Sequence, residues 1–289
     1  MHIIHLSDTH CGTGTHSARM NLIVDDILSF GDPANTVVVH TGDLIDTNNP
    51  AQMEEGRAML QRIADSGRTV LLSPGNHDYG DKWKISASQA SQFKHTLADF
   101  LFHAAPGEFP VLTLTDEVAF IGLDSNQGEM SWWSRWFAEG SLGHHQLERL
   151  NKMLDHPDVK KRTVVVYLHH QPFMGAFSVK PDVADKQFLS HITSWYNSRY
   201  LRLEDAYTFV QVIRDRIDIL LFGHRHLTLD YQAEAVRYGF KMALDGSSST
   251  SAKMDTDRMR YRVIDTQAGT YDVRFVNFPP GDKGQFSVI

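Results

Sequence analysis

Short apolar runs alternate with longer amphipathic stretches along most of this chain of 289 residues. The runs are nearly continuous and rich in Val, Ile and Leu, as expected of strands that are buried on both faces. Strands are predicted at residues 3–6, 36–39, 69–72, 118–123, 163–168 and 217–222, and helices at residues 17–30, 51–66, 87–103, 143–155 and 204–216. This alternation predicts a layered α/β domain.

The pattern changes after about Phe240. Residues 241–244, 261–265 and 271–277 are predicted strands, separated by turns such as Gln267-Ala268-Gly269. Their close spacing predicts antiparallel strands that complete a second sheet. Two packed mixed sheets with helices outside would form a four-layer α/β (α+β) sandwich. No Pro-, Gly- or Ser-rich linker divides the chain, so residues 1–289 are predicted to form a single domain.

A polar cluster follows each of five predicted strands. The clusters are Asp8-Thr9-His10, Gly42-Asp43-Leu44-Ile45-Asp46, Gly75-Asn76-His77-Asp78, His169-His170-Gln171-Pro172 and Gly223-His224-Arg225-His226. Ligands of open α/β sheets bind beyond the carboxyl ends of the strands. The five clusters are therefore expected to converge on one site at that edge.

The residue types in these clusters favour metal ions. Carboxylates, imidazoles and an Asn carbonyl are hard to borderline ligands that suit Mn, Fe or Zn. Asp8-x-His10 and His224-x-His226 are each predicted to place two ligands on the same side of an extended segment, and the glycines at 42, 75 and 223 are expected to permit sharp turns. Cys11 is the only cysteine, which argues against a structural zinc knuckle.

Each cluster alone has an ordinary explanation. Gly-Asp after a strand is often only a turn, and Gly-Asn-His-Asp also suits a turn with a helix cap. Short motifs of this kind match readily by chance. Five clusters, each directly after a strand, make a shared functional site the better explanation.

Charge and composition narrow the partners. The formal net charge of -7 at pH 7 disfavours non-specific nucleic-acid binding. The N-terminus lacks the pattern of a secretory signal, and no apolar run approaches the roughly 20 residues that cross a bilayer. We therefore expect a cytoplasmic protein that does not bind a membrane and is not adapted to bind nucleic acid.

The series Asp8-x-His10, Gly42-Asp43-x-x-Asp46, Gly75-Asn76-His77-Asp78, His169 and Gly223-His224-x-His226 resembles the calcineurin-like metallophosphoesterase superfamily. All five blocks stand in the family's order. Within the superfamily, His169-His170-Gln171-Pro172 and the compact length resemble the bacterial cyclic-nucleotide and glycerophosphodiester phosphodiesterases. Gln171 departs from the His-His-Pro-Pro that is more usual in that branch.

This resemblance implies two divalent or trivalent transition-metal ions, Mn, Fe or Zn, and a role for each residue. The first ion would be held by Asp8, His10 and His226, the second by Asn76, His169 and His224, and both by Asp43. A hydroxide shared by the ions would attack phosphorus in line. His77 would face the substrate as a catalytic imidazolium, with the Asp46 carboxylate as its partner. The implied partner is a small phosphate-ester substrate, and a phosphodiesterase is favoured over a phosphomonoesterase by resemblance alone.

Several assignments stay open in the sequence. His170 competes with His169 as ligand, and Arg225 is expected to form a surface salt bridge rather than a substrate contact. The aromatic cluster of Trp132, Trp133 and Trp136 is expected to pack, and residues 173–200 to form a lid, a rim of the site or a contact in a homo-oligomer. The alternatives in function are a DNA nuclease of the same superfamily and a scaffold that binds metal without turnover.

Overall fold

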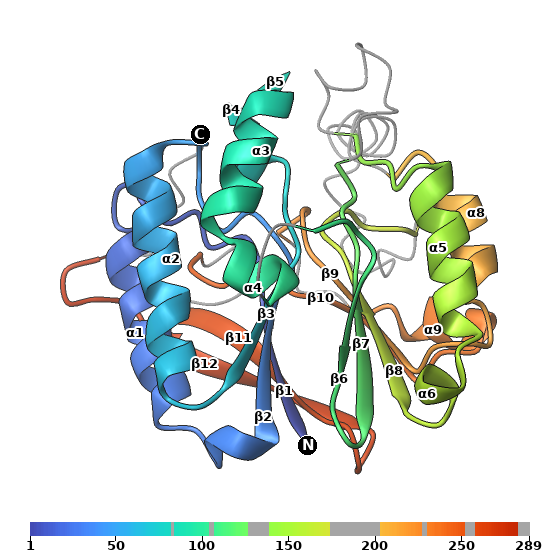
Figure 1. Cartoon of the computed structure of the whole chain (residues 1–289). Helices are drawn as coiled ribbons and strands as arrows, with labels where there is room; N and C mark the ends of the chain where they lie inside the picture. The colour runs from blue at the N-terminus through green and yellow to red at the C-terminus, as the bar shows by residue number, and fades with distance from the viewer. Residues whose placement is uncertain are drawn as a thin grey trace, which may run out of the picture.

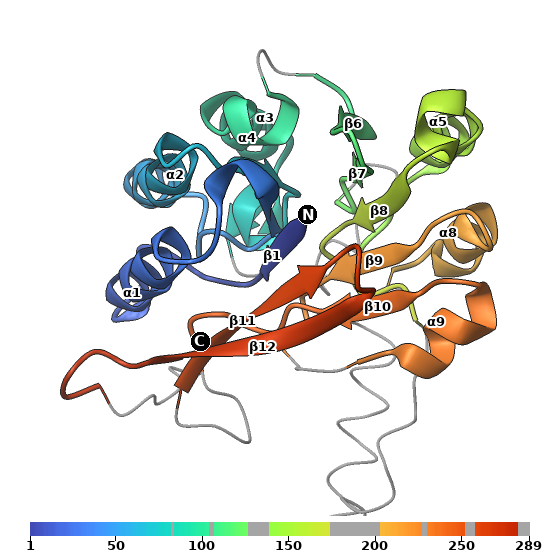
Figure 2. The ribbon, with the colours of Figure 1, turned by 90° about the horizontal axis from the view of Figure 1, so that it is seen from below.

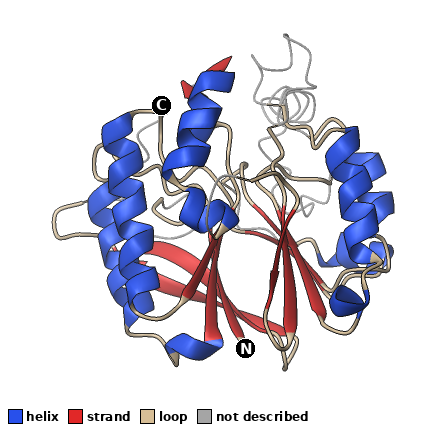
Figure 3. Cartoon of the chain, viewed as in Figure 1, coloured by secondary structure: helices blue, strands red, loops and turns tan. Residues whose placement is uncertain are grey.

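The computed structural model describes residues 1–81, 84–103, 107–126, 139–173, 203–226, 230–251 and 258–282. Two mixed β-sheets of five strands each pack face to face in the centre of the molecule. Helices cover the outer face of each sheet, so the molecule has four layers (Figures 1 and 3). The predicted α/β sandwich of two sheets flanked by helices is confirmed.

The first sheet has the strand order β12-β11-β1-β2-β3. Its strands β1, β2 and β3 are parallel, whereas β11 runs antiparallel to both β1 and β12. The strands are β1 His2–Leu6, β2 Thr36–His40, β3 Thr69–Leu72, β11 Arg258–Asp265 and β12 Thr270–Asn277. Its helices are α1 His16–Leu28, α2 Pro50–Asp65, α3 Ala87–Thr96 and α4 Ala98–Phe102.

The second sheet has the strand order β10-β9-β8-β7-β6, and only β6 is antiparallel to its neighbour. The strands are β6 Val111–Leu114, β7 Val118–Gly122, β8 Thr163–Tyr167, β9 Ile219–Phe222 and β10 Met242–Asp245. Its helices are α5 His144–Leu154, α6 Pro157–Lys160, α8 Ala206–Ile213 and α9 Gln232–Tyr238. Figure 2 shows the two groups of helices on opposite sides of the paired sheets.

Alternating side chains of each strand serve two different cores. In β1, Ile3 packs between the sheets, whereas Ile4 and Leu6 pack against the helices of the first half. In β8, Val165 packs between the sheets and Val166 packs against the helices of the second half. Burial on both faces explains why these strands are continuous apolar runs in the sequence.

The C-terminal strands differ from the prediction. β11 and β12 form a hairpin that extends the first sheet from the free edge of β1, rather than completing the second sheet. β10 joins the second sheet parallel to β9, because the intervening helix α9 carries the chain back before β10 begins. The predicted helix at 87–103 is two helices, interrupted at Leu97. The pattern also missed β6 and α9.

The parallel strands of both sheets end at the same side of the sandwich, where the five polar clusters lie. The Trp132, Trp133 and Trp136 cluster lies outside the described residues, and so does the predicted lid at 173–200 except for Phe173. Of the helices within the described ranges, none has the length and apolar character to span a bilayer.

Candidate metal centre

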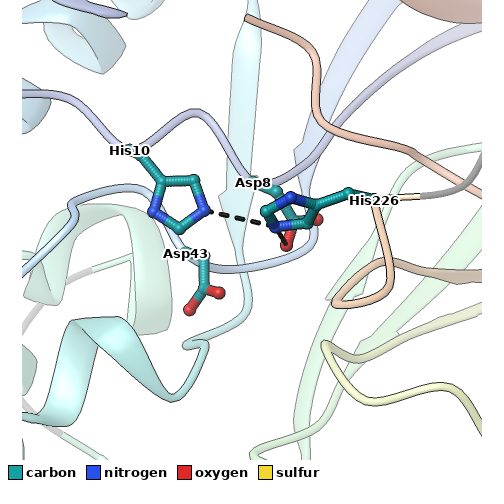
Figure 4. Close-up of side chains that lie close together, drawn as sticks. All are labelled: Asp8, His10, Asp43 and His226. Atoms are coloured by element: carbon teal, nitrogen blue, oxygen red, sulfur yellow. Dashed lines mark hydrogen bonds and ion pairs between the residues drawn. The ribbon is translucent and has the colours of Figure 1, made fainter. Parts of the chain in front are cut away.

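Four buried or half-buried side chains from both sheets form the first group of candidate ligands. Asp8, His10, Asp43 and His226 each offer one ligand atom within 4.8 Å of the others (Figure 4). The Nε2 atoms of His10 and His226 lie 3.3 Å apart, and His226 Nε2 lies 3.1 Å from Asp8 Oδ1. Segments 216 residues apart in the sequence therefore meet in one cluster.

The second group consists of Asp43, His169 and His224, again within 4.8 Å of one another. His169 Nε2 lies 3.3 Å from Asp43 Oδ2, 3.1 Å from His224 Nδ1 and 3.1 Å from Asn76 Oδ1. Asp43 thus belongs to both groups. Six of the seven predicted ligands lie in these two groups, and the seventh, Asn76, contacts His169 of the second group.

The donor set fits a pair of cations. Two imidazole nitrogens face each other at 3.1 Å in the second group and at 3.3 Å in the first. Ligand atoms about 2.1 Å from a shared ion lie roughly 3 Å from one another, which matches this spacing. Burial opposes ionisation of the Asp43 carboxyl, but His169 and His77 outweigh it and hold its pKa well below the usual range. The shared carboxylate is therefore anionic.

Neighbouring groups orient the imidazole rings. His169 Nδ1 donates a hydrogen bond to the carbonyl of Thr41 at 2.7 Å, which leaves the lone pair of Nε2 directed into the second group. His10 Nδ1 lies 3.4 Å from Asp46 Oδ1, and its Nε2 faces His226. An imidazole fixed by a carbonyl or a carboxylate on its far nitrogen is typical of a metal ligand.

The backbone at five of the seven candidate ligands is left-handed rather than extended. The φ angles are +50° at Asp8, +47° at His10, +52° at Asp43, +77° at His224 and +53° at His226. This conformation costs a non-glycine residue about 1–2 kcal/mol and is concentrated at functional sites. The prediction that Asp8-x-His10 and His224-x-His226 lie on extended segments is wrong. At these five positions the backbone itself turns the side chain into the site.

Sharp turns are predicted at the glycines 42, 75 and 223. Of these three, only Gly42 has a positive φ, at +91°. A Cβ at Gly75 would lie 2.2 Å from Asp43 Oδ1, and one at Gly223 would lie 2.5 Å from Asp8 Oδ2. Gly75 is therefore small because the Asp43 carboxylate passes directly over it, and Gly223 because the Ser7 hydroxyl and the Asp8 carboxylate do.

His77 lies beside the two groups, with its side chain 21% exposed. Its Nδ1 donates to the backbone carbonyl of Asp46 at 2.6 Å, and its backbone N–H donates to Asp43 Oδ1 at 2.9 Å. Burial alone would lower the pKa of His77, but the Asp43 carboxylate and both acceptor groups of Asp46 raise it above the ordinary value. The ring is therefore disposed to carry a proton.

The Asp46 carboxylate lies closer to His10 than to His77, its predicted partner. Its Oδ1 lies 3.4 Å from His10 Nδ1 but 3.9 Å from His77 Nδ1. The closest contact of His77 with Asp46 is with the backbone carbonyl. The Asp46 carboxylate thus orients a candidate ligand at least as directly as it supports His77.

Three residues that follow β8, His169 to Gln171, each have different partners. His169 lies in the second group, whereas His170 Nδ1 pairs with Ser125 Oγ at 2.8 Å, outside it. Gln171 donates to Tyr231 Oη at 2.6 Å and accepts from Arg225 Nη1 at 3.1 Å. No carboxylate pairs with Arg225 in the part of the chain that is described, so its predicted surface salt bridge is absent there.

Asp78 belongs to one of the five polar clusters, but the sequence predicts no role for it. It is fully buried, and its carboxylate accepts from the backbone N–H groups of Ile45 at 3.2 Å and Gly75 at 2.8 Å. Burial and the nearby Asp43 raise its pKa to about 7. This residue ties two ligand-bearing loops together. Its signal was its place in the Gly75–Asp78 block, three residues after a glycine.

Solved structures share the fold. A dimetal phosphatase from Danio rerio superposes with a TM-score of 0.60 at 12% identity, covering 96% of this chain and 99% of the other. A purple acid phosphatase from yellow lupin (Lupinus luteus) seeds superposes with a TM-score of 0.54 at 14% identity, covering 98% of this chain and 52% of the other. Identities this low establish the fold alone.

Sequence relatives include two DNA double-strand break repair proteins Mre11. The protein of Sulfurisphaera tokodaii is 22% identical over 223 residues, 73% of this chain and 52% of the relative. That of Sulfolobus acidocaldarius is 33% identical over 86 residues, 27% of this chain and 22% of the relative. The chain thus spans about half the length of these relatives or less. Residues 1–227, which contain every candidate ligand, match the calcineurin-like phosphoesterase family, and the chain belongs to that family.

Proposed function

We propose that this phosphoester hydrolase cleaves phosphate diesters with the help of two transition-metal ions, Mn, Fe or Zn. The observation that carries the proposal is the position of Asp43, which belongs to both groups of candidate ligands. A carboxylate with two oxygens can bridge two cations, as in other sites with paired metals. Asp8, His10 and His226 would hold the first ion, and Asn76, His169 and His224 the second.

The ions, when bound, would neutralise the phosphoryl oxygens and make a bound water acidic. This chain's own residues supply the rest. His77 binds through Nδ1 to the carbonyl of Asp46, so its Nε2 is the atom left to hold or release a proton. As an imidazolium it would stabilise the charge of the transition state or protonate the leaving oxygen.

The charges near the groups support a diester. The carboxylates of Asp8, Asp43 and Asp46 pair with histidines, and no lysine or arginine of the described residues pairs with them. A phosphate diester carries one negative charge, whereas a monoester near neutral pH carries a second. In the described part of the chain, no lysine or arginine in contact with these carboxylates offsets that second charge. The likeness of the His169–Pro172 block to phosphodiesterases points the same way.

A DNA nuclease is the second candidate. The matches to two Mre11 proteins favour it, because those relatives are DNA repair proteins. The net charge of -7 opposes it, since DNA-binding surfaces are usually basic. A small phosphate ester therefore remains the proposed substrate.

The test is a screen of metal-replete protein. Bis-p-nitrophenyl phosphate, p-nitrophenyl phosphate, cyclic nucleotides, glycerophosphodiesters and single-stranded DNA would be compared by kcat/KM, with Asp43→Asn as the inactive control. The expected result is at least about tenfold preference for the synthetic diester over the monoester, about 1.4 kcal/mol of transition-state binding. Preference for the monoester would refute the diester assignment, and rapid DNA cleavage would favour the nuclease.

A further inference from the structure

A run of small residues follows β10 and lies deep in the molecule. We call residues 246–251 the serine loop; its sequence is Gly-Ser-Ser-Ser-Thr-Ser. Ser248, Ser249, Thr250 and Ser251 are each at most 1% exposed. The loop lies beyond residues 1–227, the part of the chain that matches the family. Buried hydroxyl groups need partners, so their contacts indicate what the loop does.

Three consecutive loop residues contact three consecutive residues after β1. Ser249 bonds Ser7 twice: its Oγ accepts from Ser7 N at 3.1 Å, and its N–H donates to Ser7 O at 2.9 Å. Ser248 Oγ donates to the carbonyl of Asp8 at 2.7 Å. Thr250 Oγ1 donates to the carbonyl of Thr9 at 2.9 Å. The loop therefore contacts the backbone of each residue from 7 to 9 in the first ligand-bearing segment.

Among the described residues, no strand neighbours residues 7–9 on the side where β11 pairs with β1. Pairing between β1 and β11 ends at His5 and Arg262. Beyond that point the N–H groups of Asp8 and His10 donate to the carbonyls of Gly42 and Asp43. The carbonyls of residues 7–9 are left without a strand, and buried carbonyls without partners are costly. The serine loop supplies the missing donors where the sheet no longer can.

We propose that the serine loop is a positioning element for the first metal site. Asp8 and His10 have left-handed backbones, at φ +50° and +47°, which a free chain would avoid. Hydrogen bonds on both edges of the segment hold these two side chains toward His226. The proposal rests on the proposed function in that Asp8, His10 and His226 are taken to bind an ion.

Thr250 is the most connected residue of the serine loop. Because its hydroxyl hydrogen is donated to Thr9 O, it must accept from His16 Nδ1, which lies 2.8 Å away. Its backbone carbonyl accepts from Arg19 Nη1 at 3.1 Å. Thr250 thereby joins α1 to the segment after β1, and its hydroxyl is the one whose loss should matter most.

The chain offers a matched control in the same loop. The Ser251 hydroxyl is equally buried but has no hydrogen-bond partner among the residues that the structure describes. Ser251→Ala therefore removes a hydroxyl of the same size, from the same loop, without removing a hydrogen bond. Thr250→Val removes the hydroxyl at constant shape, and Thr250→Ser restores it.

The test measures Mn²⁺ affinity of each site separately. In a His169→Ala background, which retains only the first site, Thr250→Val is expected to raise the Kd about tenfold, the lower range for partners that orient metal ligands. Thr250→Ser should restore the affinity, and Ser251→Ala should leave it unchanged. In a His226→Ala background, which retains only the second site, Thr250→Val should change the Kd by less than about twofold. Equal losses in both backgrounds, or an equal effect of Ser251→Ala, would overturn the proposal.

A second measurement does not depend on metal. Hydrogen–deuterium exchange of the peptide that contains residues 3–11, in metal-free protein, should accelerate in Ser249→Ala and Thr250→Val but not in Ser251→Ala. Unchanged exchange in the first two variants would refute the positioning role even if the metal sites are real. If exchange accelerates in Ser249→Ala and Thr250→Val but the wild-type protein binds no Mn²⁺, the proposed function is refuted and the structural role of the loop remains.

Discussion

The candidate ligands come from two regions that are built differently. The loops after β1, β2 and β3 hold one another through backbone hydrogen bonds, among them Asp8 N to Gly42 O at 2.9 Å and Ser73 N to His40 O at 2.9 Å. The loop after β9, which carries His224 and His226, is anchored on the carboxylate of Asp8. His224 N donates to both Asp8 oxygens, at 3.1 and 3.2 Å.

This difference makes the site asymmetric. The first-sheet loops form a frame that exists without a metal ion, because main-chain groups and Asp78 complete it. The loop after β9 depends on a side chain that is itself a candidate ligand. Removal of the Asp8 carboxylate should therefore affect both regions, whereas damage to the loop after β9 should remain local.

The strongest way to break this comparison is Asp8→Ala. It removes a ligand of the first ion and also the acceptor that holds His224. We expect loss of metal from both sites and a fall in kcat/KM of at least about 10³, since a bound metal ion contributes several kcal/mol to catalysis. The measurements are elemental analysis and steady-state kinetics.

Asp8→Asn is the matched control, because it keeps an oxygen acceptor for His224 N–H. It should retain more of the second ion than Asp8→Ala does. Equal metal content in the two variants would show that the loop after β9 does not depend on this carboxylate.

His169 and His170 follow β8 and test the ligands of the second sheet within one dipeptide. His169→Ala should abolish measurable activity and weaken the second site, because Nε2 of His169 faces Asp43, Asn76 and His224. His170→Ala should leave metal content largely intact, since its Nδ1 pairs with Ser125 instead. The reverse pattern in elemental analysis would move the ligand by one residue.

His77→Ala sharpens the distinction between holding metal and doing chemistry. The variant should keep both ions but lose about 10²- to 10⁴-fold in turnover, the scale of a general acid or a charge stabiliser. A plot of rate against leaving-group pKa separates the two roles. The loss shrinks for p-nitrophenolate if His77 protonates the leaving oxygen, and is constant if it stabilises phosphoryl charge. Loss of an ion would show that His77 is a ligand.

Asp46→Asn separates the two contacts of that carboxylate. Because it lies closer to His10 than to His77, the variant should weaken the first site as well as lowering turnover. Removal of a carboxylate behind a metal-binding histidine commonly costs about 10- to 100-fold in metal affinity. Unchanged Mn²⁺ binding with reduced turnover would return Asp46 to the role of partner for His77 alone.

The smallest effect concerns Cys11, which sits in the first-sheet frame. Its thiol is fully buried, and burial raises its pKa to about 12. Iodoacetamide should therefore leave the native protein unmodified at neutral pH and label it only after denaturation, as read by mass spectrometry. Rapid labelling of the native protein would show that the frame opens easily.

The sequence predicts the layers well because strands buried on both faces are continuous apolar runs in the sequence. Strands such as β2 and β8 are continuous Val-rich runs, since both of their faces contact apolar neighbours. The sheet to which β11 and β12 belong leaves no such pattern. It depends on which strand has a free edge, and that edge belongs to β1, more than 250 residues earlier in the chain.

The candidate ligands are equally visible in the sequence, but the geometry that gathers them is not. Asp8 and His224 are polar residues after apolar runs, yet no local pattern shows that their backbones are left-handed. The serine loop has a visible composition, but hydroxyl residues are typical of solvated turns. Its burial follows only from the place where β1 leaves β11, which is a property of the assembled sheets.

The most direct test of the account is the number of ions held with and without the shared carboxylate. Metal-free wild-type protein and Asp43→Asn would be titrated with Mn²⁺ by calorimetry, and the loaded proteins checked by elemental analysis. The account predicts two ions in the wild type and weakened binding of both in the variant, because Asp43 belongs to both groups. Two ions bound with unchanged affinity by Asp43→Asn would contradict it.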